Sequence, residues 1–198
     1  MEKKQNIVAI VQARMNSTRL PGKVLKMLGD MPALELLLRR LQKSTLIDKI
    51  IVATSTNSED DQLFEIVINL GFDCFRGSEN NVLERYVQAI KSSPARTIVR
   101  ITGDCPLIDP DLVDKVISSY KRKNVKYASN VNPPSFPDGM DVEVIDRETL
   151  ESLLTRPLDK SDLEHVTSAL HNDKNLAKAN LRSPKDLSQI RITLDEKE

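Results

Sequence analysis

The chain alternates between short apolar runs and longer segments with helical spacing. The first run, residues 7–11 (IVAIV), is continuous and rich in β-branched residues, and residues 49–53 (KIIVA) and 97–101 (TIVRI) have the same character. Such runs are typical of strands that are buried on both faces, as in parallel sheets. Because helical patterns separate them, the alternation predicts an α/β domain with a mostly parallel central sheet.

Capping residues and breakers give expected bounds for the other elements. Helices are expected over residues 33–43, 59–70, 82–91 and 109–120, with a short strand at 73–75. The first helix has Asp30 as its candidate N-cap and Pro32 near its first position, and Gly71 follows the end of the second. In the last third, strands are expected at 140–145, 177–181 and 190–194, and helices at 147–154 and 160–171.

Length and charge limit the classes of protein to consider. The 198 residues suit one domain, in which residues 1–120 and 121–198 form two functional parts. Lys+Arg and Asp+Glu number 29 each, and aromatic residues are only 4%, so a nucleic-acid partner is not expected. The apolar runs are too short for membrane insertion. With two cysteines and no signal peptide pattern, the sequence is expected to be cytoplasmic.

The six glycines mark the special loops. Four of them, Gly22, Gly77, Gly103 and Gly139, lie in loops with charged neighbours. Two of these loops directly follow expected strands, and Gly22 lies in the segment after the first strand. In open α/β sheets, the ligand crevice lies at the carboxyl ends of the strands. The glycine-containing loops therefore predict a polar binding site at this edge of the sheet.

The loop after the first strand carries the strongest functional signal. Residues 12–23 (QARMNSTRLPGK) contain three cations, three small hydroxyl or amide side chains, a proline and a glycine. A polyphosphate is bound by such a combination of backbone amides, hydroxyls and cations. The loop is not a Walker A motif, because Ser17 stands where the first glycine is required and Val24 follows Lys23. It has no GxGxxG pattern either.

The segment VQARMNSTRLPGK at residues 11–23 resembles the signature of cytidylyltransferases of the acylneuraminate and KDO type, in particular the branch of spore-coat polysaccharide biosynthesis. The resemblance continues through IIVATS (50–55), FRGSENNVLERY (75–86), VRITGDCPLIDP (99–110), FPDGMDVEV (136–144), SDLEHVT (161–167) and RITLD (191–195). It implies a GT-A-like, three-layer α/β/α nucleotidyltransferase fold. It also implies a reaction in which a sugar is activated by CTP, with Mg²⁺ as cofactor and pyrophosphate as the second product.

The resemblance assigns roles to the residues around the nucleotide. Arg14 and Lys23 would hold the triphosphate and, with Asp104, form the catalytic set. The full nucleotide-binding set would be Gln12, Ala13, Arg14, Ser17, Thr18, Arg19, Lys23, Thr54, Ser55, Arg76 and Ser78. Cations are expected there because phosphoryl-type transfer depends mostly on positioning and on stabilising negative charge.

Two carboxylates would hold the metal. Asp104 follows a buried strand and precedes Pro106, which directs it into the crevice, and Mg²⁺ prefers one or two carboxylates together with substrate phosphates. The resemblance makes Asp195 the second ligand. Family members continue into a final helix after this motif. The chain is either short by nature or lacks that helix, which leaves the position of Asp195 open.

The acceptor sugar would lie on the other side of the crevice. Asp138, Asp141 and Glu143 would face it, with the last two on one side of a strand. Glu164 and His165 are expected on a helix, where they would bind substrate or act as a general base. The resemblance also makes a homodimer an expected assembly.

Two other functions compete with sugar activation. One is a GT-A glycosyltransferase that consumes a nucleotide-sugar; its DxD candidate, Asp109-Pro110-Asp111, lies at a helix start, and a loop suited to a triphosphate favours synthesis instead. The other is a non-catalytic nucleotide-binding module. The presence of Arg14, Lys23 and Asp104 argues against it. The sequence leaves the sugar unidentified, and the cytosine base is implied only by the resemblance.

Overall fold

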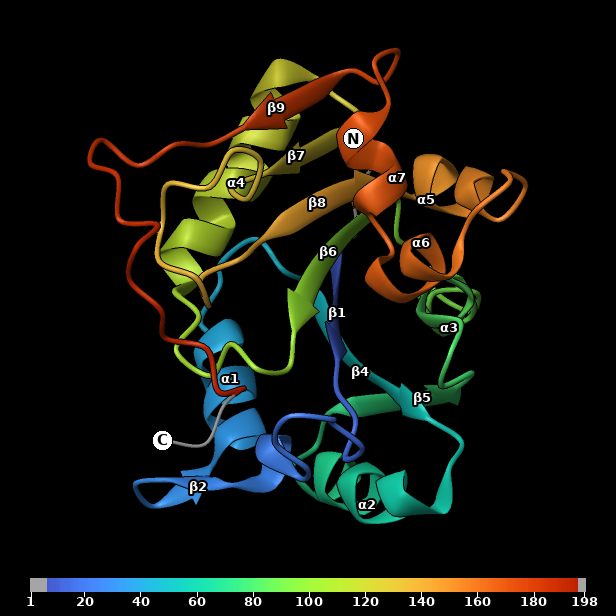
Figure 1. Cartoon of the computed structure of the whole chain (residues 1–198), viewed down its shortest axis with the longest axis vertical. Coiled ribbons are helices and arrows are strands. Elements are labelled where there is room, and N and C mark those ends of the chain that lie inside the picture. Colours follow the sequence, from blue (N-terminus) through green and yellow to red (C-terminus); the bar gives the residue numbers. More distant parts are fainter. Residues whose placement is uncertain (1–6, 196–198) are drawn as a thin grey trace.

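The first apolar run forms β1 (Ile7–Gln12), which lies near the middle of a seven-stranded sheet in the computed structural model describing residues 7–195 (Figure 1). The strand order is β5-β4-β1-β6-β8-β7-β9. On its two sides, β1 pairs in parallel with β4 (Lys49–Ser55) and β6 (Thr97–Thr102), and β5 (Asp73–Gly77) pairs in parallel with β4. The predicted mostly parallel sheet is confirmed.

Shorter strands extend the sheet beyond β6. Of these, β8 (Glu143–Asp146) runs antiparallel to both β6 and β7 (Tyr127–Ser129), and β9 (Lys178–Asn180) pairs in parallel with β7. The sequence suggested strands near β8 and β9 but not β7, which has only three residues. All three of these strands lie within residues 121–195.

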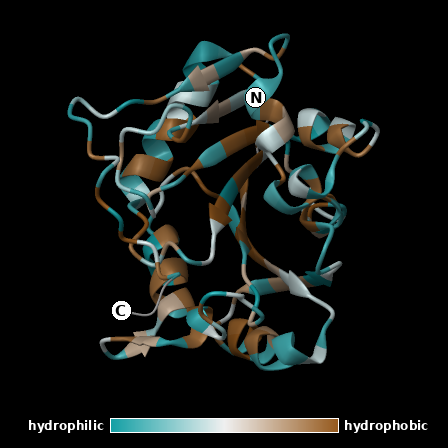
Figure 2. Cartoon of the chain, in the orientation of Figure 1, coloured by the Kyte–Doolittle hydropathy of each residue, from teal (hydrophilic) through white to brown (hydrophobic). Residues whose placement is uncertain are grey.

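Helices cover both faces of the sheet, which gives the predicted three layers (Figure 1). One face packs against α1 (Ala33–Leu41), α2 (Asp61–Asn69) and α4 (Pro110–Lys123). The other packs against α3 (Val82–Ala89), α5 (Arg147–Leu153), α6 (Lys160–His165) and α7 (Ser168–Asn172). The apolar colouring in Figure 2 follows the central strands and the inner sides of these helices. Alternate residues of β1 supply the two cores, because Val11 packs on the first face and Ile10 on the second.

Several expected bounds are corrected by the structure. The N-cap of α1 is Pro32, so Asp30 is not the cap. The expected strand at 190–194 is replaced by one bridge between Asp138 and Arg191. The expected helix over 160–171 is broken at Val166, whose φ of 61° ends α6 before α7 begins. The strand expected from residue 140 begins only at Glu143.

Smaller elements complete the described chain. A hairpin, β2 (Met27–Leu28) and β3 (Met31–Pro32), precedes α1, and single 3₁₀ turns lie at Lys23–Leu25 and Ser58–Asp60. Among residues 7–195, no helix is both long enough and apolar enough to cross a membrane.

The order of the strands determines where a ligand can bind. The chain adds β4 and β5 on one side of β1 and then crosses back to place β6 on the other, so the carboxyl ends of β1 and β6 form the crevice of this sheet. Gly103 closes the gap between them, because its N–H donates to the Gln12 carbonyl at 2.8 Å. A Cβ at this position would lie 2.8 Å from the same oxygen, so this approach requires glycine.

Candidate active site

A cavity of about 320 Å³ opens at the carboxyl ends of β1 and β6. Its walls come from the loop after β1, the turn after β6, the first part of α3 and the end of α6. The lining residues are Gln12, Ala13, Arg14, Ser17, Thr18, Arg19, Lys23, Val24, Val82, Arg85, Arg100, Thr102, Gly103, Asp104, Glu164 and His165. All seven predicted nucleotide-binding residues of the first loop therefore lie on one cavity, together with predicted residues from two distant segments.

The first loop, residues 12–23, curls around one peptide group. The Met15 carbonyl accepts hydrogen bonds from the amides of Ser17 (3.0 Å) and Gly22 (2.8 Å). Gly22 adopts a φ of 68°, a conformation that favours glycine, and the 3₁₀ turn at Lys23 starts directly after it. This fold of the loop brings Lys23, at its far end, back to the cavity that Arg14 lines near its start.

Lys23 and Asp104 form an ion pair across the cavity floor. The Lys23 Nζ lies 2.8 Å from Asp104 Oδ2, and both side chains are largely buried. Burial alone raises the pKa of Asp104, but the hydrogen bond and the charge of Lys23 outweigh burial and lower it. Asp104 is therefore an anion at neutral pH, and the ion pair brings it together with Lys23 at the cavity.

The other two loop cations are also paired with carboxylates. Arg14 Nη2 lies 3.4 Å from Glu164 Oε1, which connects the loop to α6. Arg19 Nη2 lies 2.8 Å from Asp195 Oδ2. Asp195 is only 4% exposed and also accepts from Arg191. Together with the Lys23–Asp104 pair, these two pairs link the loop to three segments that are far away in the sequence.

Four predicted nucleotide-binding residues do not line this cavity. Thr54 and Ser55 are buried at the end of β4, where the Ser55 hydroxyl donates to Asp60 at 2.5 Å. The Arg76 guanidinium donates to the Ser55 carbonyl at 2.9 Å, and the Ser78 hydroxyl accepts from a backbone amide just before α3. The Thr54 hydroxyl is buried and has no hydrogen-bond partner within residues 7–195. The contact of these four residues with a nucleotide stays a prediction.

The acceptor candidates divide into two groups. Glu164 and His165 line the cavity from α6, whereas Asp138 and Asp141 do not. Asp138 pairs with Arg191. Burial, followed by the nearby negative charges of Asp138 and Glu143, raises the pKa of Asp141 to about 6.

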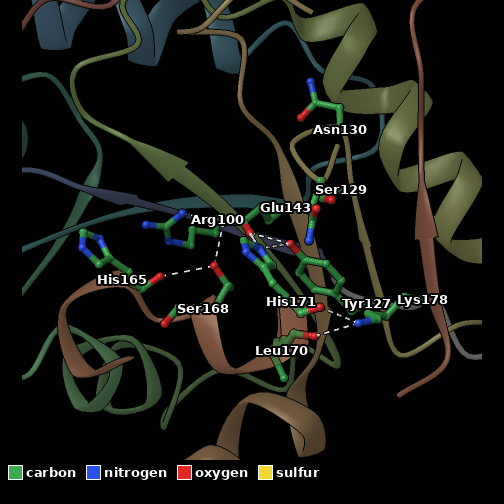
Figure 3. Close-up of polar contacts among 12 residues, drawn as sticks. Arg100, Tyr127, Ser129, Asn130, Glu143, His165, Ser168, Leu170, His171 and Lys178 are labelled. Carbon is green, nitrogen blue, oxygen red and sulfur yellow. Dashed lines mark hydrogen bonds and ion pairs between the residues drawn. The ribbon is translucent and has the colours of Figure 1, made fainter. Parts of the chain in front are cut away.

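Glu143 is not among the residues that line the cavity. Figure 3 shows it in a cluster of polar side chains with Arg100, Tyr127 and His171. Its carboxylate is buried and accepts from Arg100 Nη1 (2.5 Å), the Tyr127 hydroxyl (2.5 Å) and the Thr167 hydroxyl (3.1 Å), and His171 Nε2 lies 3.0 Å away. Burial opposes ionisation, but Arg100 and the other donors hold the pKa down at about 2. Both oxygens are occupied, and Glu143 holds Arg100 in place. The contact of Glu143 with an acceptor sugar, which the sequence suggested, stays a prediction. Asp141 does not share a strand face with it, because β8 begins at Glu143.

Comparison with known proteins decides the family. Residues 8–197 match a sequence model that describes the family Cytidylyltransferase. The chain belongs to this family. An uncharacterized protein of Methanocaldococcus jannaschii is 41% identical over 192 residues, covering 96% of this chain and 78% of the relative. The spore coat polysaccharide biosynthesis protein SpsF of Bacillus subtilis is 37% identical over 201 residues, covering 98% and 82%.

Solved structures agree with this assignment. A cytidylyltransferase from Leptospira borgpetersenii superposes with a TM-score of 0.92 at 33% identity, covering 96% of this chain and 82% of that one. The synthetase of CMP-2-keto-3-deoxy-manno-octonic acid, in complex with CTP, has a TM-score of 0.73 at 15% identity and covers 96% and 93%, which shows the shared fold. The expected nucleotidyltransferase fold and enzyme class are confirmed.

The cytidylyltransferase has two cavity cations that the sequence reasoning missed. Arg100 lies within the apolar run of β6 and is held by Glu143, and a cation inside a buried strand is the signal that could have revealed it. Arg85, on α3, is 2% exposed and donates to the Ser78 carbonyl at 2.5 Å. Its Nε has no hydrogen-bond partner within residues 7–195, and burial lowers its pKa. Both bring further positive charge to the cavity.

The residues around Asp104 fit a metal ion that takes most of its ligands from the substrate and water. Residues 7–195 contain no group of three or more His, Cys, Asp or Glu side chains that could hold a metal ion by themselves. Asp104 offers a single carboxylate at the cavity, which suits a Mg²⁺ ion that takes its other ligands from substrate phosphates and water. Both candidate ligands are paired in this conformation, Asp104 with Lys23 and Asp195 with Arg19 and Arg191.

Proposed function

We propose that this cytidylyltransferase transfers a cytidylyl group from CTP to a sugar or sugar phosphate, giving a CMP- or CDP-sugar and pyrophosphate. The observation that carries the proposal is the single cavity that joins the cations of the first loop to Asp104 and to the α6 wall. The name of the Bacillus subtilis relative supports a product destined for a surface polysaccharide.

The first loop would bind the triphosphate. Its backbone amides and the cations Arg14, Arg19 and Lys23 would neutralise the phosphates and stabilise the charge that develops on the leaving pyrophosphate. An acceptor oxygen would attack the α-phosphorus in line, forming a new P–O bond while the bond to the bridging α–β oxygen breaks. That oxygen leaves with the pyrophosphate and keeps the bonding electron pair.

Asp104 would hold the divalent cation together with the phosphates. When bound, Mg²⁺ would neutralise phosphate oxygens that the loop cations do not reach. Lys23 would then contact the phosphate directly, and its removal should lower the rate by about 10²-fold. Asp195 is proposed as a second ligand once its arginine partners engage the nucleotide.

The α6 wall would bind the acceptor. His165 and Glu164 line the cavity from α6, and Asp138 and Asp141 are proposed to contact the sugar outside the lining. For an acceptor hydroxyl, His165 would accept the proton that is released. For an acceptor phosphate, no proton transfer is needed. Thr54, Ser55, Arg76 and Ser78 are proposed to lie near the pyrimidine.

Calorimetry tests the nucleotide part of this proposal. CTP, UTP, GTP and ATP are titrated into the wild type and Lys23→Ala, each with Mg²⁺ and with EDTA. We expect CTP to bind selectively and to bind more weakly in EDTA and in the variant. A panel of sugars and sugar phosphates is then assayed for CTP-dependent pyrophosphate release. Binding without turnover of any acceptor would favour a nucleotide-binding module, and no triphosphate binding at all would overturn the proposal.

A further inference from the structure

Asp60 is a buried carboxylate that lies outside the cavity but contacts the first loop. It ends the 3₁₀ turn before α2 and is 2% exposed. Its Oδ1 accepts a hydrogen bond from the Met15 amide at 2.6 Å. Its Oδ2 accepts from the Ser55 amide at 3.0 Å and from the Ser55 hydroxyl at 2.5 Å. One carboxylate therefore joins the loop to the end of β4.

The contact falls on the peptide that shapes the loop. The carbonyl of Met15 already accepts from Ser17 and Gly22 within the loop, and its amide attaches the same turn to Asp60 and so to the end of β4. Arg14 precedes Met15, and Lys23 follows Gly22. A displacement of Met15 would therefore move both cations relative to Asp104, which is fixed separately at the end of β6.

The charge of Asp60 suits this role. Burial raises its pKa, but the hydrogen bonds from Met15 and Ser55 lower it below its usual value, so the group is ionised. An ionised carboxylate accepts hydrogen bonds on both oxygens and cannot donate. Aspartate can therefore accept all three hydrogen bonds. Asparagine has the same size but only one accepting oxygen, so it cannot.

We propose that Asp60 is a positioning residue of the transfer reaction, which acts through the Met15 amide to hold the first loop in the shape that presents Arg14 and Lys23 to the phosphates. The inference rests on the proposed function, since it assumes that this loop binds the triphosphate. It adds a residue that does not touch the cavity and that the sequence patterns did not single out.

The test compares Asp60→Asn with a matched control, Asp114→Asn. Asp114 also has a lowered pKa despite burial and accepts from a backbone amide and two hydroxyls, those of Thr45 and Ser44, but it lies outside the cavity lining. In each variant a donating NH₂ group replaces one accepting oxygen, so both lose hydrogen bonds to a neighbouring loop. Asp60 is more buried than Asp114, so the two variants are compared only under conditions in which both are folded. Of the two, only the Asp60 variant removes a contact with the first loop.

Pyrophosphate with Mg²⁺ is the binding probe, at a temperature at which every variant is folded. We expect Asp60→Asn to bind pyrophosphate at least about 10-fold more weakly and to lose on the order of 10²-fold in kcat, because small misplacements of binding groups are costly in catalysis. Asp114→Asn should stay within about twofold of the wild type in both. Ser55→Ala, which keeps the Met15 contact, should fall between them. Equal behaviour of the Asp60 and Asp114 variants would overturn the inference.

Hydrogen exchange of the wild type provides a test that needs no ligand. The Met15 amide should exchange slowly for a loop amide and should lose this protection in Asp60→Asn. If it exchanges in the wild type at the rate of an unprotected amide, the inference fails whatever the enzyme binds. If the wild type binds neither CTP nor pyrophosphate while Met15 is protected, the proposed function fails, and with it the role of Asp60 in the reaction.

Discussion

Alanine at position 103 would push apart the two strand ends that form the cavity floor. Its Cβ would lie 2.8 Å from the Gln12 carbonyl oxygen and 3.0 Å from the Ala13 Cβ, whereas carbon contacts are relaxed at about 3.5–4.0 Å. The strand ends must separate by about 0.5 Å or more, which stretches the hydrogen bond between Gly103 and Gln12. Overpacking of this kind costs about 1–3 kcal/mol. For a chain of this length, the melting temperature should fall by roughly 3–10 °C.

Thermal unfolding and CTP titration check this expectation. Because Asp104 directly follows Gly103, the Gly103→Ala enzyme should also bind CTP with Mg²⁺ about 10-fold more weakly. Gly71→Ala is the control, since Gly71 has a φ of 83° but open space where a Cβ would lie, so the change adds backbone strain without a clash. The reasoning is refuted if Gly103→Ala melts no lower than Gly71→Ala and keeps wild-type affinity for CTP.

Three further expectations concern buried titratable groups. The folded-state pKa of Asp141 is raised to about 6 by burial and by neighbouring carboxylates, so its charge lowers stability above pH 6 and this cost fades as the pH falls toward 4. Asp141→Asn should therefore stabilise the protein by about 1–3 kcal/mol in denaturant unfolding at pH 7.5 and by much less at pH 4.5. Glu143→Gln should destabilise it by about 3–5 kcal/mol, because Arg100 would keep a buried charge without its counter-charge; an unfolding midpoint like that of the wild type would contradict this. Burial raises the pKa of Cys74 to about 11 and that of Cys105 further, so a thiol reagent at pH 8 should label both cysteines slowly until denaturant is added.

The central fold could be predicted because its signals are local. The runs that form β1, β4 and β6 are continuous and apolar. This is the usual sequence pattern of parallel strands that are buried on both faces. The break at Val166 could not be predicted, because a β-branched residue disfavours a positive φ and the surrounding packing imposes it. Residues 190–194 have a strand-like pattern but pair with their neighbour at only one bridge.

The site was predictable in part for the same reason. The loop after β1 is one continuous segment, so its composition alone indicated a phosphate-binding surface. The role of Arg100 depends on Glu143, which follows it by 43 residues and meets it only through the antiparallel pairing of β6 and β8. Asp60 likewise acquires its contact with Met15 through tertiary structure. Such partners are determined by the assembled sheet and leave no short motif.

The ion pairs of the loop cations give the enzyme a set of built-in counter-ions. Lys23, Arg14 and Arg19, which line the cavity, each already have a carboxylate partner. A polyphosphate that binds here as proposed would replace these carboxylates, and its affinity would be the difference between two sets of ion pairs. The replacement would free the carboxylates as the phosphates bind, so one half of each pair would be available to the anion and the other half to an accompanying cation.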